Sequence, residues 1–208
     1  ENGEIRSYKF VKSVICSRVK GVYKEINALL EPEEGVDLTD LKTKYEAVLD
    51  QLPTMDELYR KRLVLRKARG AMDIESNEAK LVMDENGRCI DIVKRDRGTS
   101  ECMIEEFMLL ANRRVAEFCG KRKTDKGRTV ERTMVYRVHD KPSEEKLDRF
   151  RQFILRFGHI FKATGGRAVA KELNKLFAQI KGSTEENAVS TMAVRSMAKA
   201  FYTTDNIG

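Results

Sequence analysis

The stretch Cys102-Met-Ile-Glu-Glu-Phe-Met-Leu-Leu-Ala-Asn112 is the one from which the rest of the chain can be interpreted. Its apolar residues cover much of the circumference of a helix, which predicts a central helix. At about 100° per residue, Glu105 and Asn112 fall on nearly one line along that helix. A carboxylate inside an apolar surface is costly unless it is paired. We therefore expect Glu105 to be buried, either in a structural ion pair with an Arg or Lys or facing a ligand.

The other elements follow from periodicity and from turn residues. Upstream, the sequence predicts an extended strand over residues 8–16 and amphipathic helices over residues 18–30, 40–52 and 54–70. A β-hairpin is expected over residues 79–96, because Asn86 and Gly87 suit a tight turn. Downstream, the pattern predicts an exposed, mobile basic loop (120–132), a short strand (134–138) and helices over 143–157, 166–182 and 183–202. The expected fold class is α+β: a mainly helical fragment with a few antiparallel strands and one β-hairpin.

Composition narrows the class of protein. The 208 residues suit one large domain or part of a larger one. A net charge of +7, with 35% charged residues, favours an anionic partner such as RNA over a neutral small molecule. The four cysteines form no Cys-x-x-Cys pair, so we expect buried thiols in a reducing compartment, the cytoplasm by default. No apolar run of about 18 residues and no charged-then-apolar leader is present, so neither a membrane span nor a secretory signal is expected.

Several features have a structural and a functional interpretation. The helix expected over residues 54–70 carries a basic stripe, which is either a solvated helix face or an RNA contact. Its members are Arg60, Lys61, Arg62, Arg66, Lys67 and Arg69. Tyr23 lies on the apolar face of its helix, where a core tyrosine is the simpler interpretation. His139 has no second ligand or nucleophile nearby, which favours a structural role.

The chemistry of phosphodiester hydrolysis is incomplete in these residues. Such hydrolysis normally needs several carboxylates that hold one or two Mg²⁺ ions. Glu105 and Glu106 point about 100° apart around the helix, a poor arrangement for sharing one ion. No glycine-rich phosphate loop, Gly-x-Ser-x-Gly elbow or His-Glu-x-x-His motif is present. We therefore expect no catalytic residue and no metal ligand in this chain.

A family resemblance accounts for this incompleteness. Residues 104–112 resemble the signature helix of the catalytic (RNB) domain of the ribonuclease II and ribonuclease R family of exoribonucleases. Further segments agree in order: Phe10–Ser17, Arg69–Ser76 with Glu78–Lys80, Tyr136–His139 and Tyr202–Gly208. The resemblance covers residues 1–208 but only the middle part of the family's catalytic domain. It implies one partial RNB-type domain, truncated at both ends, with the metal-binding aspartates upstream.

The resemblance also implies an activity and three binding residues. Members of the family degrade single-stranded RNA processively from its 3′ end, use Mg²⁺ and release 5′-mononucleotides. Because the metal-binding aspartates of the family lie upstream of these residues, the isolated fragment is expected to be inactive. Glu105 matches a glutamate that contacts the sugar of a nucleotide near the 3′ end, and Tyr23 matches a tyrosine beside that end. Ile74 matches an aromatic residue that clamps the terminal bases, but isoleucine has no ring for stacking. A competing hypothesis is a non-catalytic basic RNA-binding or scaffold module, which the net charge and the basic stripe indicate.

Overall fold

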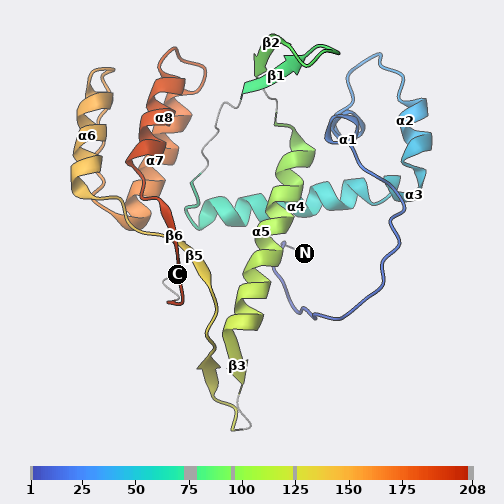
Figure 1. Cartoon of the computed structure of the whole chain (residues 1–208), viewed down its shortest axis with the longest axis horizontal. Helices are drawn as coiled ribbons and strands as arrows, with labels where there is room; N and C mark the ends of the chain where they lie inside the picture. Colours follow the sequence, from blue (N-terminus) through green and yellow to red (C-terminus); the bar gives the residue numbers. More distant parts are fainter. Residues whose placement is uncertain (1, 73–78, 95–96, 124–125, 206–208) are drawn as a thin grey trace. The chain divides into compact units, whose positions relative to one another are not determined.

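The computed structural model describes residues 2–72, 79–94, 97–123 and 126–205. The chain divides into two compact units, shown in Figure 1. Unit 1 comprises Glu1–Arg66 with Asp96–Arg132, and unit 2 comprises Lys67–Arg95 with Thr133–Gly208. Helices dominate both, and within the described ranges the strands form antiparallel two-stranded sheets. The expected α+β class is confirmed.

Unit 1 is built around two long helices. Its helical elements are α1 (Tyr23–Leu30), α2 (Thr39–Lys44), α3 (Glu46–Leu49), α4 (Leu52–Ala68, of which the last two residues belong to unit 2) and α5 (Thr99–Gly120). The helix expected over 40–52 is instead the short pair α2 and α3. Pro53, which falls between the helices expected over 40–52 and 54–70, lies in the first turn of α4. Proline is tolerated there because the first backbone N–H groups of a helix have no partner within the helix.

The N-terminal segment of unit 1 differs from the expected strand. Residues 8–16 form no strand in the structure, and Val14 and Ile15 are almost fully exposed. The even-numbered apolar pattern alone was misleading, because a strand also needs a neighbouring strand to bond its backbone groups. Instead, Phe10 of this segment packs against Phe118 of α5, with 4.8 Å between the ring centroids.

The predicted helix containing residues 102–112 is confirmed as α5, but its surroundings differ from the prediction. Met103 is buried, whereas Met108, Leu109 and Phe118 are exposed. Within unit 1, α1, α4 and the N-terminal segment pack on α5 and leave part of its apolar surface uncovered. The cysteine expectation was likewise wrong, because Cys16, Cys89 and Cys119 are exposed free thiols. Cys102 is partly buried.

A short hairpin follows α5 where we expected a loop. Strands β3 (Lys121–Lys123) and β4 (Thr129–Glu131) pair antiparallel, with Lys121 opposite Glu131 and Lys123 opposite Thr129. The backbone N–H of Arg132 donates to the carbonyl of Gly120 at 2.8 Å and closes the base of the hairpin. Gly127 has a φ of 74°, which suits the turn. The predicted exposure of this segment is confirmed at Lys121 and from Lys126 onward.

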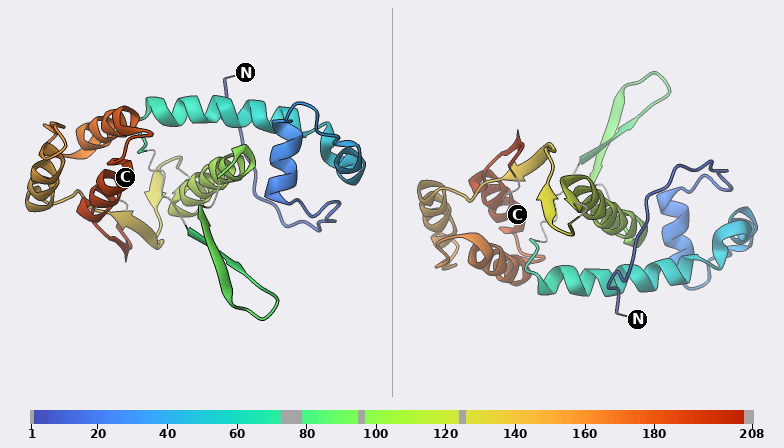
Figure 2. Two further views of the ribbon diagram at one scale, coloured as in Figure 1. Left: turned by 90° about the horizontal axis from the view of Figure 1, so that it is seen from above. Right: turned by 90° about the horizontal axis from the view of Figure 1, so that it is seen from below.

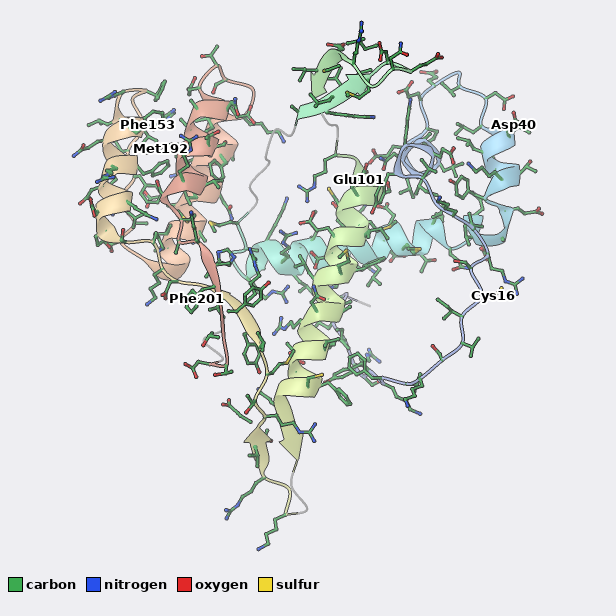
Figure 3. All side chains as sticks on the ribbon, viewed as in Figure 1. Cys16, Asp40, Glu101, Phe153, Met192 and Phe201 are labelled. Atoms are coloured by element: carbon green, nitrogen blue, oxygen red, sulfur yellow. The ribbon has the colours of Figure 1, made fainter. Side chains whose placement is uncertain are left out.

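Unit 2 contains a three-helix core. Helices α6 (Glu144–Leu155), α7 (Gly166–Ile180) and α8 (Glu186–Ser196) pack together, as Figures 1 and 2 show. Fully buried side chains from all three fill the centre, among them Phe150, Leu173 and Val189. Phe153 of α6 and Met192 of α8 flank this core (Figure 3). The helices expected over residues 166–182 and 183–202 correspond to α7 and α8, which are neighbours in this core.

Two hairpin-like pairings complete unit 2. The predicted hairpin is confirmed as β1 (Ala79–Met83) and β2 (Cys89–Lys94), with Gly87 at a φ of 75° in its turn. Strand β5 (Tyr136–His139) pairs with β6 (Ala200–Thr203). The helix expected over 183–202 therefore ends early, at Ser196. The residues after it instead satisfy their backbone groups by pairing with β5.

Candidate nucleic-acid interface

Asn27 of α1 holds the start of α5. Its side-chain Oδ1 accepts a hydrogen bond from the backbone N–H of Ser100 at 2.7 Å, and its Nδ2 donates to Glu101 Oε2 at 2.9 Å. The backbone N–H of Gly98 also donates to Glu101 Oε2, at 3.1 Å. Gly98 is the N-cap residue of α5, and the hydrogen-bond acceptor for the first turn is supplied by Asn27 from another helix. Figure 3 labels Glu101 at this end of α5.

The contacts of Asn27 with Ser100 and Glu101 form a joint between α1 and α5. Tyr23 is the first residue of α1 and lies at this joint. Its carbonyl accepts a hydrogen bond from Ser100 Oγ at 3.1 Å, while its side chain is 45% exposed. The preceding backbone N–H, of Val22, donates to the hydroxyl of Tyr45 at 3.1 Å. Tyr45 is fully buried and donates in turn to Glu25. The backbone of Tyr23 is thus fixed on two sides, and its ring is not the core tyrosine of the simpler interpretation.

Glu105 is held by arginines but is not buried. Its side chain is 43% exposed, forms an ion pair with Arg97 and lies 3.8 Å from Arg66 Nη1. Asn112, on the same line of the helix, is exposed. The expectation of burial was wrong, because the packed face of α5 lies about 100° away around the helix. Glu105 lies five residues after Ser100, a rise of about 7.5 Å along the helix. The joint that holds the backbone of Tyr23 therefore also sets the position of the Glu105 carboxylate.

The buried carboxylate of α5 is Glu106. Its side chain is 2% exposed and lies 3.7 Å from Arg62 Nε and 3.6 Å from Arg66 Nη1. Arg62 is itself buried and donates to the carbonyl of Gly3 at 3.1 Å. Glu106 follows the buried Met103 by three residues, so both side chains lie on the packed face of α5. The sequence alone did not single out this face, because Glu105 has the same spacing to Met108, which is exposed.

Two carboxylates near the joint have pKa values below the ordinary value of 4.5. Burial raises the pKa of Glu101, but the hydrogen bonds from Asn27, from the backbone, from Ser100 and from Gly98 together lower it. A hydrogen bond from Lys44 and another from Tyr45 lower the pKa of Glu25. Both groups therefore stay ionised at neutral pH, and Glu101 places a negative charge beside the N-terminus of α5, where the helix dipole favours it.

The basic stripe of α4 is largely engaged with carboxylates. Arg60 pairs with Asp56 at 2.7 Å, and Lys61 pairs with Glu57 at 2.6 Å. Arg62 and Arg66 pair with Glu106 as described above. Of the two original interpretations, neither a solvated face nor an open RNA contact describes Arg62, which is 6% exposed. The stripe is mainly a set of ion pairs that ties α4 to itself and to α5.

The remaining site predictions have mixed outcomes. Ile74, the proposed base clamp, lies outside the described residues. His139 is exposed and contacts the carbonyl of Ala198 through Nδ1 at 3.2 Å. Among the described residues, no three His, Cys, Asp or Glu side chains come close enough to hold a metal ion.

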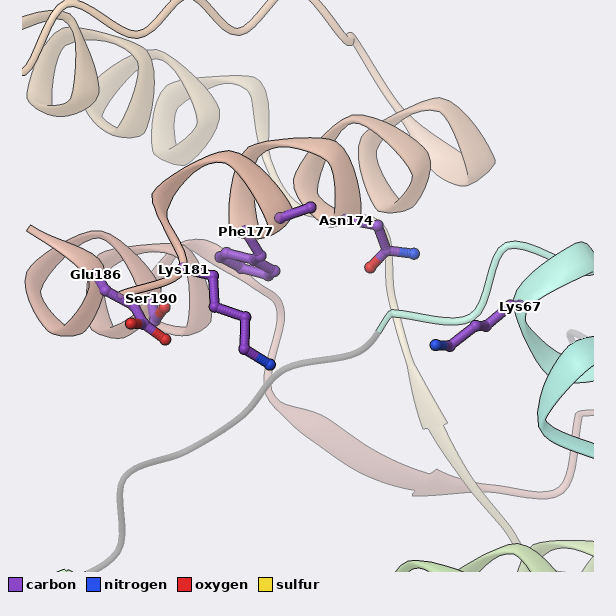
Figure 4. A pocket seen from close by; sticks show the side chains of 7 residues that line it. Lys67, Asn174, Phe177, Lys181, Glu186 and Ser190 are labelled. Carbon is purple, nitrogen blue, oxygen red and sulfur yellow. The ribbon is translucent and has the colours of Figure 1, made fainter. Parts of the chain in front are cut away.

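Unit 2 has an open pocket with a volume of about 350 Å³, shown in Figure 4. Its lining residues are Lys67, Asn174, Phe177, Ala178, Lys181, Glu186 and Ser190. The amide of Asn174 donates to the carbonyl of Ala71 at 2.8 Å, which ties α7 to the segment after α4. The lining offers lysine charges, one carboxylate and one ring.

The chain belongs to the RNB domain family, because the family model for the RNB domain matches residues 1–208. Ribonuclease R from Thermotoga maritima is 34% identical over the whole of this chain, and the match covers 27% of that protein's length. Ribonuclease R 1 from Lactococcus lactis is 32% identical over 99% of this chain, and the match covers 24% of that protein's length. The chain thus spans about a quarter of the length of these relatives.

Solved structures agree on the fold. The apo form of Mycoplasma genitalium RNase R has a TM-score of 0.68 and 24% identity to this chain. The match covers 88% of this chain and 26% of the RNase R chain. The same enzyme in complex with ribose-methylated single-stranded RNA matches with a TM-score of 0.66 and 23% identity.

None of the helices that the structure describes has the length and apolar content needed to cross a bilayer.

Proposed function

We propose that this chain is part of an exoribonuclease that hydrolyses RNA processively from the 3′ end, uses Mg²⁺ and releases 5′-mononucleotides. The observation that carries the proposal is the match of the whole chain to the RNB domain family, whose curated relatives are named ribonuclease R. One solved relative is a complex with single-stranded RNA and another is a complex with double-stranded RNA, which supports RNA as the ligand class.

The joint between α1 and α5 supports the proposed contact with the 3′ end. Glu105 presents a partly exposed carboxylate, which can accept a hydrogen bond from a ribose hydroxyl. Arg97 and Arg66 orient that carboxylate, and Tyr23 offers an exposed ring within the same unit. An exposed ring and a sugar-binding carboxylate in one unit suit the terminal nucleotide of a single strand.

The described residues do not fit a magnesium site by themselves. Magnesium in nucleases is held by carboxylates with free oxygen lone pairs. Glu105 and Glu106 are instead paired with arginines, and within the described ranges no cluster of three donor side chains exists. In our proposal the metal ligands are therefore supplied by other parts of the full-length protein, and the 208-residue chain alone is inactive.

The competing function is a non-catalytic basic RNA-binding or scaffold module. The net charge of +7 favours it. The basic stripe supports it less, since Arg60, Lys61 and Arg66 already pair with carboxylates. An aspartate cluster encoded upstream would favour the nuclease, and its absence there would favour the module.

We also propose a cytoplasmic location, because all four cysteines are free thiols.

A labelled-RNA assay tests the proposal. Full-length protein with Mg²⁺ is expected to release a 3′-terminal label at once as a mononucleotide and to shorten a 5′-labelled strand without accumulating long intermediates. Chelation of the metal should stop both reactions. The 208-residue chain should release nothing under the same conditions. Internal cleavage by the full-length protein would contradict the exonuclease, and nucleotide release by the short chain would contradict its inactivity.

A further inference from the structure

The C-terminal half of α5 has exposed aromatic rings on its surface. Phe118 is 53% exposed and packs against Phe10, which is 42% exposed. Tyr8 contacts Phe10 edge-on, with 5.6 Å between ring centroids. The guanidinium of Arg114 lies 5.6 Å from the centroid of the Tyr8 ring. Single exposed apolar residues are ordinary, but a contiguous group of rings beside a cation is typical of an interaction surface.

The β3–β4 hairpin continues this surface with positive charge. Figure 1 shows β3 starting where α5 ends, and Phe118 precedes Lys121 by less than one helical turn. Basic residues dominate the sequence of the hairpin, with Lys121, Arg122, Lys123, Lys126, Arg128 and Arg132 against Asp125 and Glu131. Lys121, Lys126 and Arg132 are exposed. The sequence alone had shown these charges without aromatic residues among them, and the structure adds the rings of Tyr8 and Phe10 from a distant segment.

We propose that the ring cluster of Tyr8, Phe10 and Phe118, together with Lys121, Lys126 and Arg132 of the β3–β4 hairpin, forms a sequence-independent binding surface for single-stranded RNA. Stacking rings next to a basic track are the combination that binds single strands, because every base has a flat face and every nucleotide carries a phosphate. A duplex would offer its phosphates to the hairpin but not its base faces to the rings. The choice of RNA over other polyanions rests on the proposed function.

Salt dependence tests the basic part of the surface. The 208-residue chain is titrated with a fluorescent oligouridine of about 16 nucleotides, the upper site size of such surfaces. The variant Lys121→Gln/Lys126→Gln/Arg132→Gln should bind at least about tenfold more weakly, and its salt slope should fall by about 2, since each phosphate contact contributes about 0.7 for single strands. The control Lys80→Gln/Lys141→Gln/Lys162→Gln removes equal charge from exposed lysines of unit 2. Equal losses in both variants would overturn the proposal.

Ring removal tests the stacking part. Phe118→Leu keeps apolar volume but removes the ring, and it should weaken binding about fivefold or more while leaving the salt slope unchanged. Phe157→Leu is the matched control, because Phe157 is 43% exposed and contacts the Phe153 ring edge-on in unit 2. Unchanged affinity of Phe118→Leu, or equal losses for single-stranded and duplex RNA, would overturn the proposal.

The nuclease assay separates this inference from the proposed function. In the full-length protein, the hairpin variant should lose affinity for long single strands but hydrolyse very short ones at the wild-type rate. Failure of the wild-type protein to degrade RNA would contradict the proposed function alone. Normal affinity of either the hairpin variant or the Phe118→Leu variant for long single strands would overturn the binding surface alone.

Discussion

The side-chain Oδ1 of Asn27 lies 2.7 Å from the backbone nitrogen of Ser100, so a residue of α1 caps the first turn of α5. The same joint carries the backbone of Tyr23 and, about one and a half turns further along α5, the side chain of Glu105. One hydrogen-bonded contact between two helices therefore fixes both residues proposed to meet the RNA end.

The Asn27 contact predicts non-additive mutations. A Cβ atom at Gly98 would lie 2.1 Å from Asn27 Nδ2, so Gly98→Ala must displace the cap and destabilise the chain. Asn27→Ala alone should cost about 1 kcal/mol as a lost helix cap. In the double variant the clash is absent, so urea unfolding should show a loss smaller than the sum of the single losses. An additive result would mean that Asn27 does not occupy this position.

Glu106 and Glu105 should differ sharply in their effect on stability. Removal of one partner from a buried ion pair leaves an uncompensated charge and costs about 3 kcal/mol or more. Glu106→Ala should therefore lower the free energy of unfolding by about that amount, toward the lower end because Arg66 is 21% exposed. Glu105→Ala should cost less than about 1 kcal/mol, as expected for an exposed pair. Denaturant unfolding of both variants measures the difference, and equal losses would contradict the assigned burial.

Glu105 should matter for activity rather than for stability. In the full-length protein, Glu105→Ala should lower kcat/KM on RNA by about tenfold or more, the size of one lost hydrogen bond to a charged group. If the carboxylate accepts from a ribose hydroxyl, the wild-type preference for an RNA end over a deoxyribose end should shrink in the variant. Glu145→Ala is the control, since Glu145 is an exposed carboxylate that pairs with Arg149 in unit 2. A normal kcat/KM in Glu105→Ala would remove the residue from the site.

Glu101 should make the fold sensitive to acid. Its pKa is lowered in the folded state, so its contribution to stability is fully present above 4.5 and is lost as pH falls through the lower folded value. Glu101→Gln should therefore be less stable at neutral pH, yet lose less stability than the wild type when pH falls below 4.5. Unfolding free energies measured over this range provide the comparison. Parallel curves for the two proteins would show that Glu101 does not titrate with folding.

Ile74 provides a prediction about retention of the RNA end. If its position clamps the terminal bases, Ile74→Phe adds a stacking ring and should tighten retention of short oligonucleotides by about fivefold or more. Ile160→Phe, at a 70% exposed position, is the control for an added ring. Dissociation rates of short labelled oligonucleotides from the full-length protein report the effect. An unchanged rate for Ile74→Phe would place the clamp at another residue.

Much of the fold follows from local pattern. Helical periodicity located α5, α6 and α7, and the Asn86-Gly87 turn located the β1–β2 hairpin, because these signals are carried by neighbouring residues. The β3–β4 hairpin and β6 were missed, since strand pairing depends on a partner elsewhere in the chain. Which of Glu105 and Glu106 is buried depended on which face α4 covers.

The site was harder to predict than the fold. Asn27 carried no sequence signal as a cap for α5, because Ser100 lies far along the chain from it. The pairing of Arg97 with Glu105 and the stacking of Phe10 on Phe118 likewise join residues that only the folded chain brings together. The spacing of Glu106 after Met103 gave no local signal, because Glu105 has the same spacing to Met108, which is exposed.

The register of β5 and β6 has a consequence for how this part of the protein can vary. His139 stands opposite Ala200, so the chain leaves for α6 and returns after α8 at neighbouring points of one ladder. The intervening helices have their own fully buried centre. The ladder therefore sets the distance between the two ends of residues 140–199, whatever the length of the chain that joins them.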